Sequence, residues 1–192
     1  MFNNMCKANR KLEAFRYVLT KFVAYQMKLT SASSDKPMTR DETLSSFSNK
    51  RLMKLLYLLC LESISIEDEK GLFETFNNMI AYPNGPVEQD VYDGLGLIKG
   101  AKYEDGKLLS FDDNIDIRTE HHNKIDAAFD KLVNHLQDDD FLNTERLINI
   151  VHSLYLWPKT YVSSSDKLMD VNNKDELIKE KKAYEQVVSK SA

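Results

Sequence analysis

The sequence predicts a mainly α-helical, compact domain organised around one buried central helix, and it allows one small β-hairpin. Only six of the 192 residues are glycine and four are proline, while 29% are charged, which suits a helical protein better than a β-sandwich or barrel. Apolar residues recur at helical spacing in several segments. A chain of this length can bury one good core, so we expect a single domain.

The central helix is predicted at residues 49–62. Four leucines fall at the helical positions i, i+3, i+4 and i+7: Leu52, Leu55, Leu56 and Leu59. Most of the remaining circumference is apolar as well: Met53, Tyr57, Cys60 and Leu61. A helix that is apolar nearly all round needs cover on most sides, so it is expected at the centre. Its interior cation, Lys54, should lay its stem along apolar neighbours and bring its ammonium beside a carboxylate or carbonyl group.

An amphipathic helix over residues 8–29 is expected to cover the central helix. Its apolar face contains Leu12, Phe15, Leu19, Phe22, Val23 and Leu29. Its basic residues lie mostly off that face: Lys11, Arg16, Lys21 and Lys28. The serine-rich residues 30–39 predict an exposed loop. Thr39 and Glu42 then predict a capping box for a short helical turn, and Ser48 or Asn49 is expected to cap the central helix.

A tight turn is predicted at Asn84-Gly85-Pro86, after the polar residues 63–70 and a break at Gly71. Gly85 tolerates a left-handed backbone, and Pro86 suits the first position of a helix, where its missing N–H costs nothing. We therefore expect a helix that begins at about Pro86. One side of this helix would carry Val87, Val91, Tyr92 and Leu95.

The last half of the chain predicts one hairpin and three helices. Periodicity weakens between Gly94 and Ile117, where the Asp105-Gly106 pair predicts a small hairpin over residues 102–109. Helices are expected at 119–136 and 144–156, the second ended by Trp157-Pro158 because the residue before proline avoids the α region. Residues 173–189 predict a final charged helix with a narrow apolar stripe.

Charge is unevenly distributed along the chain. Residues 1–54 contain eleven Lys/Arg and four Asp/Glu, a net charge of +7, against −11 for the remainder. Two solvated faces that neutralise each other explain this asymmetry better than a nucleic-acid surface, although the basic helix over 8–29 leaves a regulatory contact open. Since no reading module is visible and no apolar run approaches the ~20 residues of a membrane span, neither nucleic acid nor membrane is an expected partner.

Two isolated cysteines, Cys6 and Cys60, form neither a disulfide framework nor a metal-binding pair. The first residues do not contain the apolar core and cleavage site of a secretory signal. These observations favour a reducing, cytoplasmic location.

The titratable residues predict no catalytic or metal site. No two of the four histidines have the i, i+4 spacing with an acid between them that a helical zinc site uses: His121, His122, His135 and His152. Three consecutive carboxylates, Asp138 to Asp140, cannot all face one ion from a regular helix, so a solvated connector with a capping aspartate is favoured. The sequence has no nucleophile elbow or phosphate-binding loop. We expect no enzyme activity, cofactor or metal. The alternative is a hydrolase or metal enzyme that uses His121, His122 and Asp138 to Asp140.

Two separated motifs resemble a known family. Arg51-Leu-Met-Lys54-Leu-Leu-Tyr57 is followed by Gly71-Leu-Phe, then by Ile80-Ala-Tyr-Pro-Asn-Gly85-Pro86-Val87 and Val91-Tyr92. In order and spacing they are similar to the Panacea domain, the family of SocA-like antitoxins that includes phage-associated GepA-like proteins. The chain departs from the family pattern at Met53, Tyr82 and Asn84, where Gln, Trp and Tyr are usual. The motifs cover under a quarter of the chain, and a segment from His152 to Trp157 adds a softer resemblance.

The resemblance implies an interaction module that binds and neutralises a cognate toxin encoded beside it. By motif match, the residues expected to bind the partner are Lys54, Tyr57, Tyr82, Gly85, Pro86 and Val87. Gly85 and Pro86 are also expected to hold the fold, as are Leu55 and Leu56, whereas the polar groups of Lys54, Tyr57 and Tyr82 could act at a surface.

The domain division that follows assigns residues 1–172 to a Panacea-like helical domain. Residues 173–192 would be a charged C-terminal helix that is either docked or free to bind a partner. The resemblance also implies an alternative function, that of a proteolytic adaptor that delivers a bound toxin to a Clp-type protease. Residues 173–192 would then be the segment that contacts the protease.

Overall fold

The computed structural model describes residues 2–32, 38–113, 121–164 and 166–189, with the backbone alone for 2–8 and 32. The chain divides into two units. The first contains Met1–Leu52 and Asp90–His122, and the second contains Met53–Gln89 and Asn123–Ala192. Cys6 and most of the predicted loop over 30–39 lie outside the described side chains.

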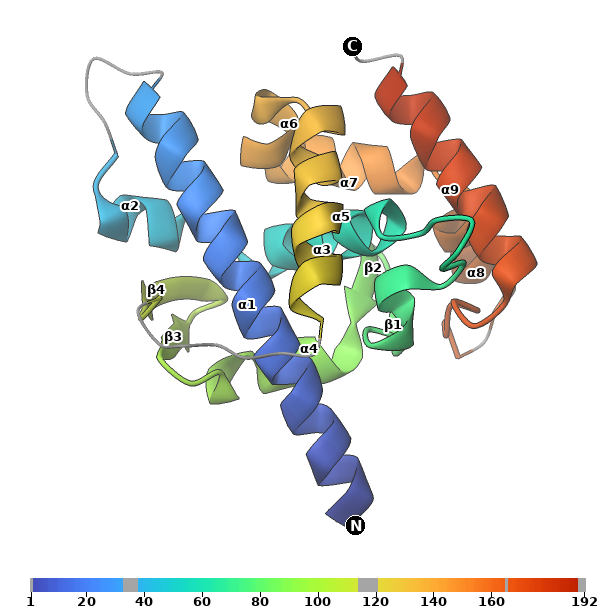
Figure 1. The fold of residues 1–192 in the computed structure, drawn as a ribbon, viewed down its shortest axis with the longest axis horizontal. Coiled ribbons are helices and arrows are strands. Elements are labelled where there is room, and N and C mark those ends of the chain that lie inside the picture. The colour runs from blue at the N-terminus through green and yellow to red at the C-terminus, as the bar shows by residue number, and fades with distance from the viewer. Residues whose placement is uncertain (1, 33–37, 114–120, 165, 190–192) are drawn as a thin grey trace. The chain divides into compact units, whose positions relative to one another are not determined.

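The first unit combines helices with one hairpin (Figure 1). Its elements are α1 (Phe2–Ala32), α2 (Arg40–Ser45), the first turn of α3 (Asn49–Glu62), most of α4 (Gln89–Gly94), the 3-10 helix η2 (Leu95–Leu97), β3 (Ala101–Glu104) and β4 (Lys107–Phe111). β3 and β4 form the predicted hairpin, and Asp105 and Gly106 at its turn have φ of 50° and 73°. The N–H of Asn49 donates to the carbonyl of Gly106 at 2.9 Å, so the hairpin turn contacts the start of α3.

Helix α1 confirms the predicted apolar face but corrects the placement of its basic residues. Phe15, Leu19 and Phe22 are fully buried. Lys11 and Arg16, expected off this face, are only 8% and 6% exposed. The ammonium of Lys11 pairs with Asp90, and Arg16 donates to the carbonyl of Asp112 at 3.3 Å. Two of the cations that suggested a basic surface are therefore used inside the first unit.

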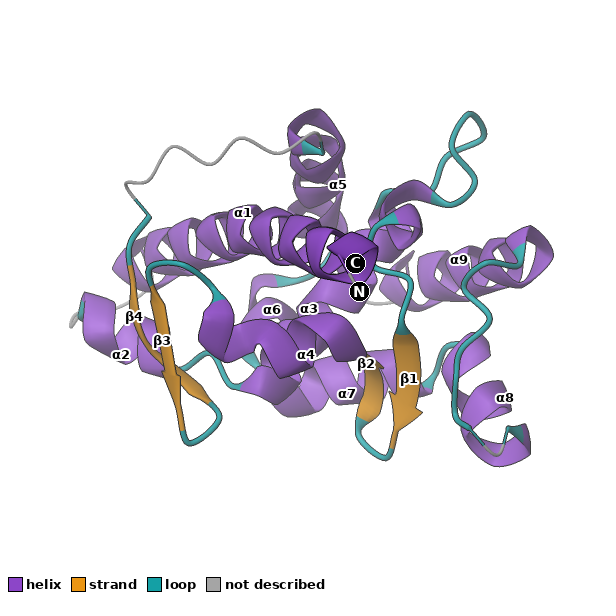
Figure 2. Ribbon diagram, turned by 90° about the horizontal axis from the view of Figure 1, so that it is seen from below, coloured by secondary structure: helices purple, strands orange, loops and turns teal. Residues whose placement is uncertain are grey.

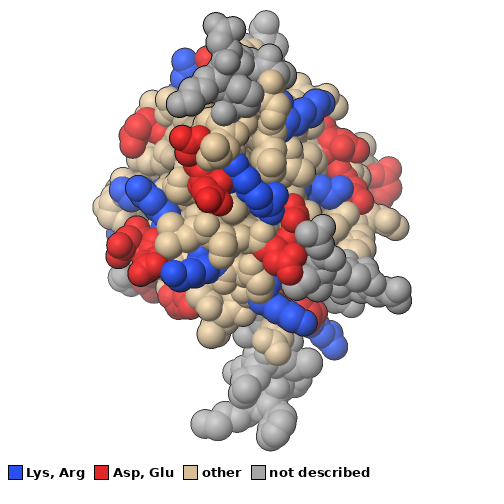
Figure 3. All heavy atoms as spheres, turned by 90° about the vertical axis from the view of Figure 1, so that its left-hand side faces the viewer, with Lys and Arg blue, Asp and Glu red and all other residues tan. Residues whose placement is uncertain are grey.

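The two helix starts predicted from capping residues are confirmed. Thr39 and Glu42 form the capping box of α2, with reciprocal side-chain to backbone hydrogen bonds. Ser48 is the residue that caps α3, because its hydroxyl accepts the N–H of Arg51 at 3.2 Å. On the face drawn in Figure 3, acidic and basic side chains of the described residues are interspersed, so that face does not gather charge of one sign.

The second unit contains the rest of α3, and every residue from Arg51 to Glu62 is buried. Its other elements are the 3-10 helix η1 (Gly71–Glu74), β1 (Met79–Tyr82), β2 (Gly85–Glu88), α5 (His122–His135), α6 (Asp138–Leu142), α7 (Thr144–His152), α8 (Leu156–Ser163) and α9 (Lys174–Ser189). The mainly α fold class and the buried central helix are thus confirmed.

The predicted helix start at Pro86 is wrong, because residues 79–88 form a second antiparallel hairpin (Figure 2). Ile80 pairs with Val87 and Ala81 with Pro86, and helix α4 begins only at Gln89. Gly85 has φ of +102°, which a right-handed helix cannot use, and the fixed φ of Pro86 fits an extended strand as well as a helix. On the other side of β1, the N–H of Ala81 donates to the carbonyl of Lys167 at 2.8 Å.

The predicted helix end at Trp157-Pro158 is also wrong. Helix α7 ends at His152, and α8 starts at Leu156 with Pro158 in its first turn. Proline is tolerated there because the first N–H groups of a helix have no partner within it. The three aspartates from Asp138 form the first turn of α6 after Gln137, so none of them is the capping residue. Their charges suit the positive end of the helix dipole.

The charged helix α9 begins after Asn173, whose side chain accepts the N–H groups of Asp175 and Glu176 at 3.1 and 3.4 Å. Leu177 and Tyr184 of α9 are fully buried, so the helix is docked within the second unit. Among the described residues, no helix is both long enough and apolar enough to cross a bilayer.

The turn at Gly85 gives the first prediction. A Cβ added there would lie 2.7 Å from Cγ2 of Val151 and 2.9 Å from Cε of Lys54, at a φ that side chains rarely adopt. Gly85→Ala should therefore lower the free energy of unfolding by about 2–5 kcal/mol, measured by urea denaturation.

Gly96→Ala is the matched control, because a Cβ at Gly96 would meet nothing within 4 Å. Its stability should change by no more than about 0.5 kcal/mol. Equal denaturation midpoints for the two variants would contradict the close approach at Gly85.

Candidate functional site

The six residues predicted to bind a partner all belong to the second unit, and three of them meet where the β1–β2 hairpin contacts α3. Lys54 is only 1% exposed, and its ammonium donates to the carbonyl of Pro86 at 2.8 Å. The stem of Lys54 passes Gly85 so closely that a side chain at Gly85 would collide with it. Lys54, Gly85 and Pro86 therefore act together to hold the hairpin on the central helix.

Tyr57 lies on the same helix and is fully buried. Its hydroxyl donates to Oε1 of Glu180 at 2.5 Å. The other carboxylate oxygen of Glu180 accepts the N–H groups of Tyr155 and Leu156 at 2.7 and 2.6 Å, at the start of α8. One side chain from α9 thus contacts α3 and caps α8, in the way that an acidic residue satisfies free N–H groups at a helix start.

Burial shapes the titration of this pair. Burial raises the pKa of Glu180, and the hydrogen bonds from Tyr57 and the two N–H groups oppose that rise without cancelling it. Burial also raises the pKa of Tyr57, and the nearby Glu180 charge adds to the effect. The interpretation of Lys54 and Tyr57 as surface groups is consequently wrong, since both are enclosed. Their part in partner binding stays a prediction, through the elements they hold.

Tyr82 has the exposed aromatic ring of the hairpin, and 42% of its surface is accessible. Its hydroxyl donates to Gln89 at 2.9 Å, and its backbone carbonyl accepts the indole N–H of Trp157 at 2.9 Å. Val87, in the partner strand, is 8% exposed. Of the six predicted residues, Tyr82 is thus the one whose side chain a partner could touch directly.

Beside the hairpin, three aromatic rings stack in series. The rings of His152 and Trp157 are 3.9 Å apart and nearly parallel at 7°, and those of Trp157 and Tyr161 are 5.2 Å apart at 14°. α8 lies beside β1, as Figure 2 shows, which brings the stack to Tyr82. We call Tyr82, His152, Trp157 and Tyr161 together the aromatic ledge, in which Trp157 is only 8% exposed.

The ledge contains no acidic, lysine or arginine side chain, and the charge beside it is the ammonium of Lys167, 5.0 Å from the centre of the Tyr161 ring. Burial, and after it the charge of Lys54, lowers the pKa of His152, so its imidazole is mainly neutral at pH 7. Two exposed apolar side chains follow Tyr161 along the chain, Val162 at 84% and Leu168 at 48%, and Leu168 forms a bridge with Ile80 of β1. The stack was not predicted, because its i, i+4 pair Trp157 and Tyr161 is visible only once α8 is known to continue through Pro158.

A second buried polar cluster centres on Glu62 at the end of α3. Its side chain is 0% exposed and pairs with Nδ1 of His135 and with Nζ of Lys181, each at 2.8 Å. Burial raises the pKa of Glu62, but the hydrogen bonds and charge of Lys181, followed by His135, outweigh it and hold the pKa below its usual value. This cluster joins α3 to α5 and to α9. Sequence reasoning missed it because the partners of Glu62 lie far along the chain.

The groups proposed for an alternative enzyme are not assembled by a single element. His122 begins α5, whereas Asp138 follows its end, and a helix of 14 residues is about 20 Å long. Within the described ranges, no group of three or more His, Cys, Asp or Glu side chains could hold a metal ion. Burial raises the pKa of the Cys60 thiol, which leaves it protonated and inaccessible.

Comparison with known protein families, with curated proteins and with solved structures finds no match to this chain. The resemblance to the Panacea domain therefore rests on the motif residues alone.

The Glu62 cluster gives the second prediction. Since the folded pKa of Glu62 is lowered, its stabilising contribution is present above the unfolded pKa near 4.3 and is lost as the pH falls through the folded value. Lys181→Met should cost about 3–5 kcal/mol of unfolding free energy at pH 7, because it leaves a buried carboxylate short of its cation. The difference from the parent protein should be smaller at pH 3.5 than at pH 7, because the buried carboxyl of the variant, without its cation, takes up a proton more readily as the pH falls.

Lys182→Met, at the next and exposed position, is the control and should change stability little at either pH. Chemical denaturation at both pH values is the measurement. If Lys181→Met lowers the free energy of unfolding equally at both pH values, then packing and not charge makes the contact stabilising.

Proposed function

We propose that this protein is an antitoxin that neutralises a cognate toxin by direct binding, with no bond made or broken. The observation that carries the proposal is the exposed ring of Tyr82, at the motif hairpin that the indole N–H of Trp157 contacts through the Tyr82 carbonyl. The resemblance supplies the class of partner, and the geometry supports a recognition surface at the same motif.

The composition of the ledge suits a protein partner. Tyr is enriched among the residues that dominate binding energy at interfaces, since it offers large apolar area with few rotatable bonds. Trp157 is only 8% exposed, so it supports the ledge rather than offering contact area itself. The rings of His152, Trp157 and Tyr161 are already stacked, so little side-chain freedom remains to be lost on binding. The neutral His152 adds no charge that a partner would have to desolvate.

The motif residues have different roles in this proposal. Tyr82 contacts the toxin, while Lys54, Gly85 and Pro86 fix the hairpin that presents it. Tyr57 acts through Glu180, which sets the start of α8 and with it the position of Trp157. Val87 packs within the hairpin. The mechanism is steric, because the ledge would cover the surface through which the toxin acts.

The adaptor alternative needs a segment free to reach a protease. The candidate, residues 173–192, includes α9, in which Leu177, Glu180 and Tyr184 are buried against the second unit. Direct neutralisation is therefore the function we propose, in the cytoplasm, where Cys60 would remain reduced.

Tyr82 gives the test of this function. The protein would be co-expressed with the product of each neighbouring gene in turn. Each pair would be scored for rescue of growth and for a stable complex in a pull-down. Tyr82→Ala should weaken binding to the toxic gene product at least about 30-fold, which is the loss expected of a central aromatic contact. It should also abolish the rescue of growth. The free energy of unfolding of this variant should fall by about 1 kcal/mol or less, because the ring is partly exposed.

Tyr92→Ala is the matched control, since Tyr92 is 43% exposed in the first unit, away from the ledge residues in sequence. It should bind and rescue like the parent protein. Failure of every neighbour to bind would overturn the antitoxin proposal, and equal effects of the two substitutions would remove the ledge from it.

A further inference from the structure

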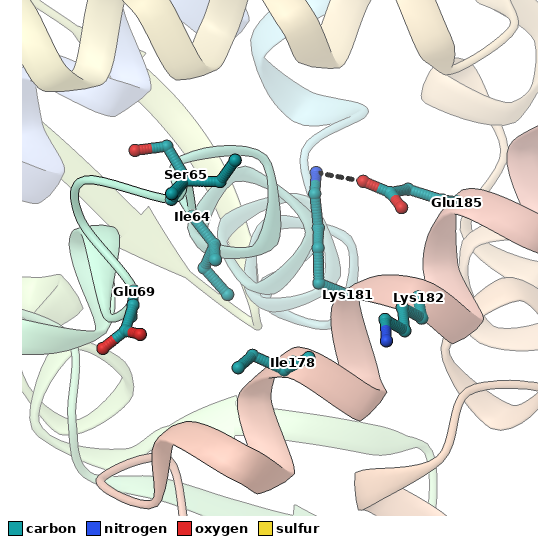
Figure 4. Close-up of a pocket in the computed structure, with 8 residues that line it drawn as sticks. Ile64, Ser65, Glu69, Ile178, Lys181, Lys182 and Glu185 are labelled. Carbon is teal, nitrogen blue, oxygen red and sulfur yellow. Dashed lines mark ion pairs between the residues drawn. The ribbon is translucent and has the colours of Figure 1, made fainter.

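A separate cleft of about 340 Å³ lies in the second unit, between the loop that follows α3 and helix α9 (Figure 4). Its apolar lining comes from three isoleucines: Ile64, Ile66 and Ile178. Ile64 is nearly buried at 8%, whereas Ile66 is 94% exposed and Ile178 36% exposed. Pockets for small molecules have volumes of about 300–1,000 Å³ and mostly apolar walls, so this cleft has the size of a small ligand site.

The charges at the rim of the cleft are not equally available. Lys181 pairs with the buried Glu62 at 2.8 Å and lies 3.9 Å from Glu185, the contact dashed in Figure 4. Glu69 pairs with Lys174. Lys182 lines the same cleft, is exposed, and makes no ion pair with any residue that the structure describes. Among the charged residues that line the cleft, Lys182 is therefore the one without an ion pair to a described residue.

We propose that the cleft binds a small amphipathic carboxylate, whose hydrocarbon chain covers Ile64, Ile66 and Ile178 and whose head group pairs with Lys182. The apolar contact supplies most of the affinity, because every methylene removed from water adds to binding, whereas an exposed ion pair is weakened by solvent. Ile178 and Lys182 are four residues apart on α9, so one helix face carries both halves of the site. This site is distinct from the proposed toxin-binding ledge and does not depend on it.

The wall of the cleft that α9 provides is fixed before any ligand arrives. Lys181 is held inward by Glu62, which is itself buried on α3. The neighbouring turns of α9 are anchored by Glu180 and Tyr184, both of them fully buried. The face that bears Ile178 and Lys182 is thus presented by a docked helix, and a ligand need not order it.

Sodium octanoate is the probe, titrated into the whole protein and followed by two-dimensional amide NMR. Saturable shifts are expected at residues 64–69 and 178–185, with 1-octanol binding the same residues and acetate giving no saturation. Lys182→Glu should weaken octanoate about fivefold or more and leave octanol unchanged. Ile178→Asn should weaken both.

Lys179→Glu, an exposed charge reversal on the same helix that does not line the cleft, is the control and should leave octanoate affinity within twofold. Each variant is first checked for an unchanged amide spectrum away from the substituted position. Octanoate shifts that fail to saturate at the cleft, or an affinity equal in Lys182→Glu and Lys179→Glu, would overturn the proposal.

Discussion

The second unit depends on one constraint: helix α3 is buried, so each polar group on it needs a partner from another element. Lys54 donates a hydrogen bond to the carbonyl of Pro86, and Tyr57 donates one to Glu180. The carboxylate of Glu62 pairs with His135 and Lys181. Each of these contacts fixes a different part of the unit, so the few polar side chains of α3 position the hairpin, the start of α8, α5 and α9.

The aromatic ledge follows from two of these contacts. Lys54 holds the hairpin that carries Tyr82, and Glu180, held by Tyr57, caps the helix that carries Trp157. The indole N–H of Trp157 then closes the arrangement on the carbonyl of Tyr82. A motif can thus contain mostly buried residues and still belong to a binding surface, because those residues determine where the exposed ring lies. This view accounts for the spacing of Lys54, Tyr57 and Gly85 without requiring any of them to touch a partner.

The sequence predicted correctly those elements whose conformation is determined by neighbouring residues along the chain. The central helix, the helix ending at His135 and the final charged helix each carry an uninterrupted 3.6-residue pattern, and the Asp105-Gly106 turn has few other conformations open to it. Gly85-Pro86 is different, since both residues fit a strand as well as a helix start. Pairing of Ile80 with Val87, which no local pattern reveals, decides between them.

The candidate site was predicted only in part, for a related reason. The motif pointed to Tyr82 and to the residues that hold it, but the rest of the ledge needs α8 to begin before Pro158. That start is stabilised by Glu180, which lies more than twenty residues further along the chain. A side chain that caps a distant helix leaves no trace in spacing or composition, so Glu180 appeared only as one charge among many on α9.

Helix α9 shows why a mostly charged sequence can dock at all. Its apolar stripe is narrow, and Leu177 and Tyr184 alone would leave the rotation of the helix weakly determined. Glu180 and Lys181 remove that freedom, because any rotation that exposes them would strand Tyr57 and Glu62 without their partners in a buried site. These buried polar pairs therefore fix the rotation of α9 about its axis. The outward direction of Ile178 and Lys182 is a consequence of the same rotation.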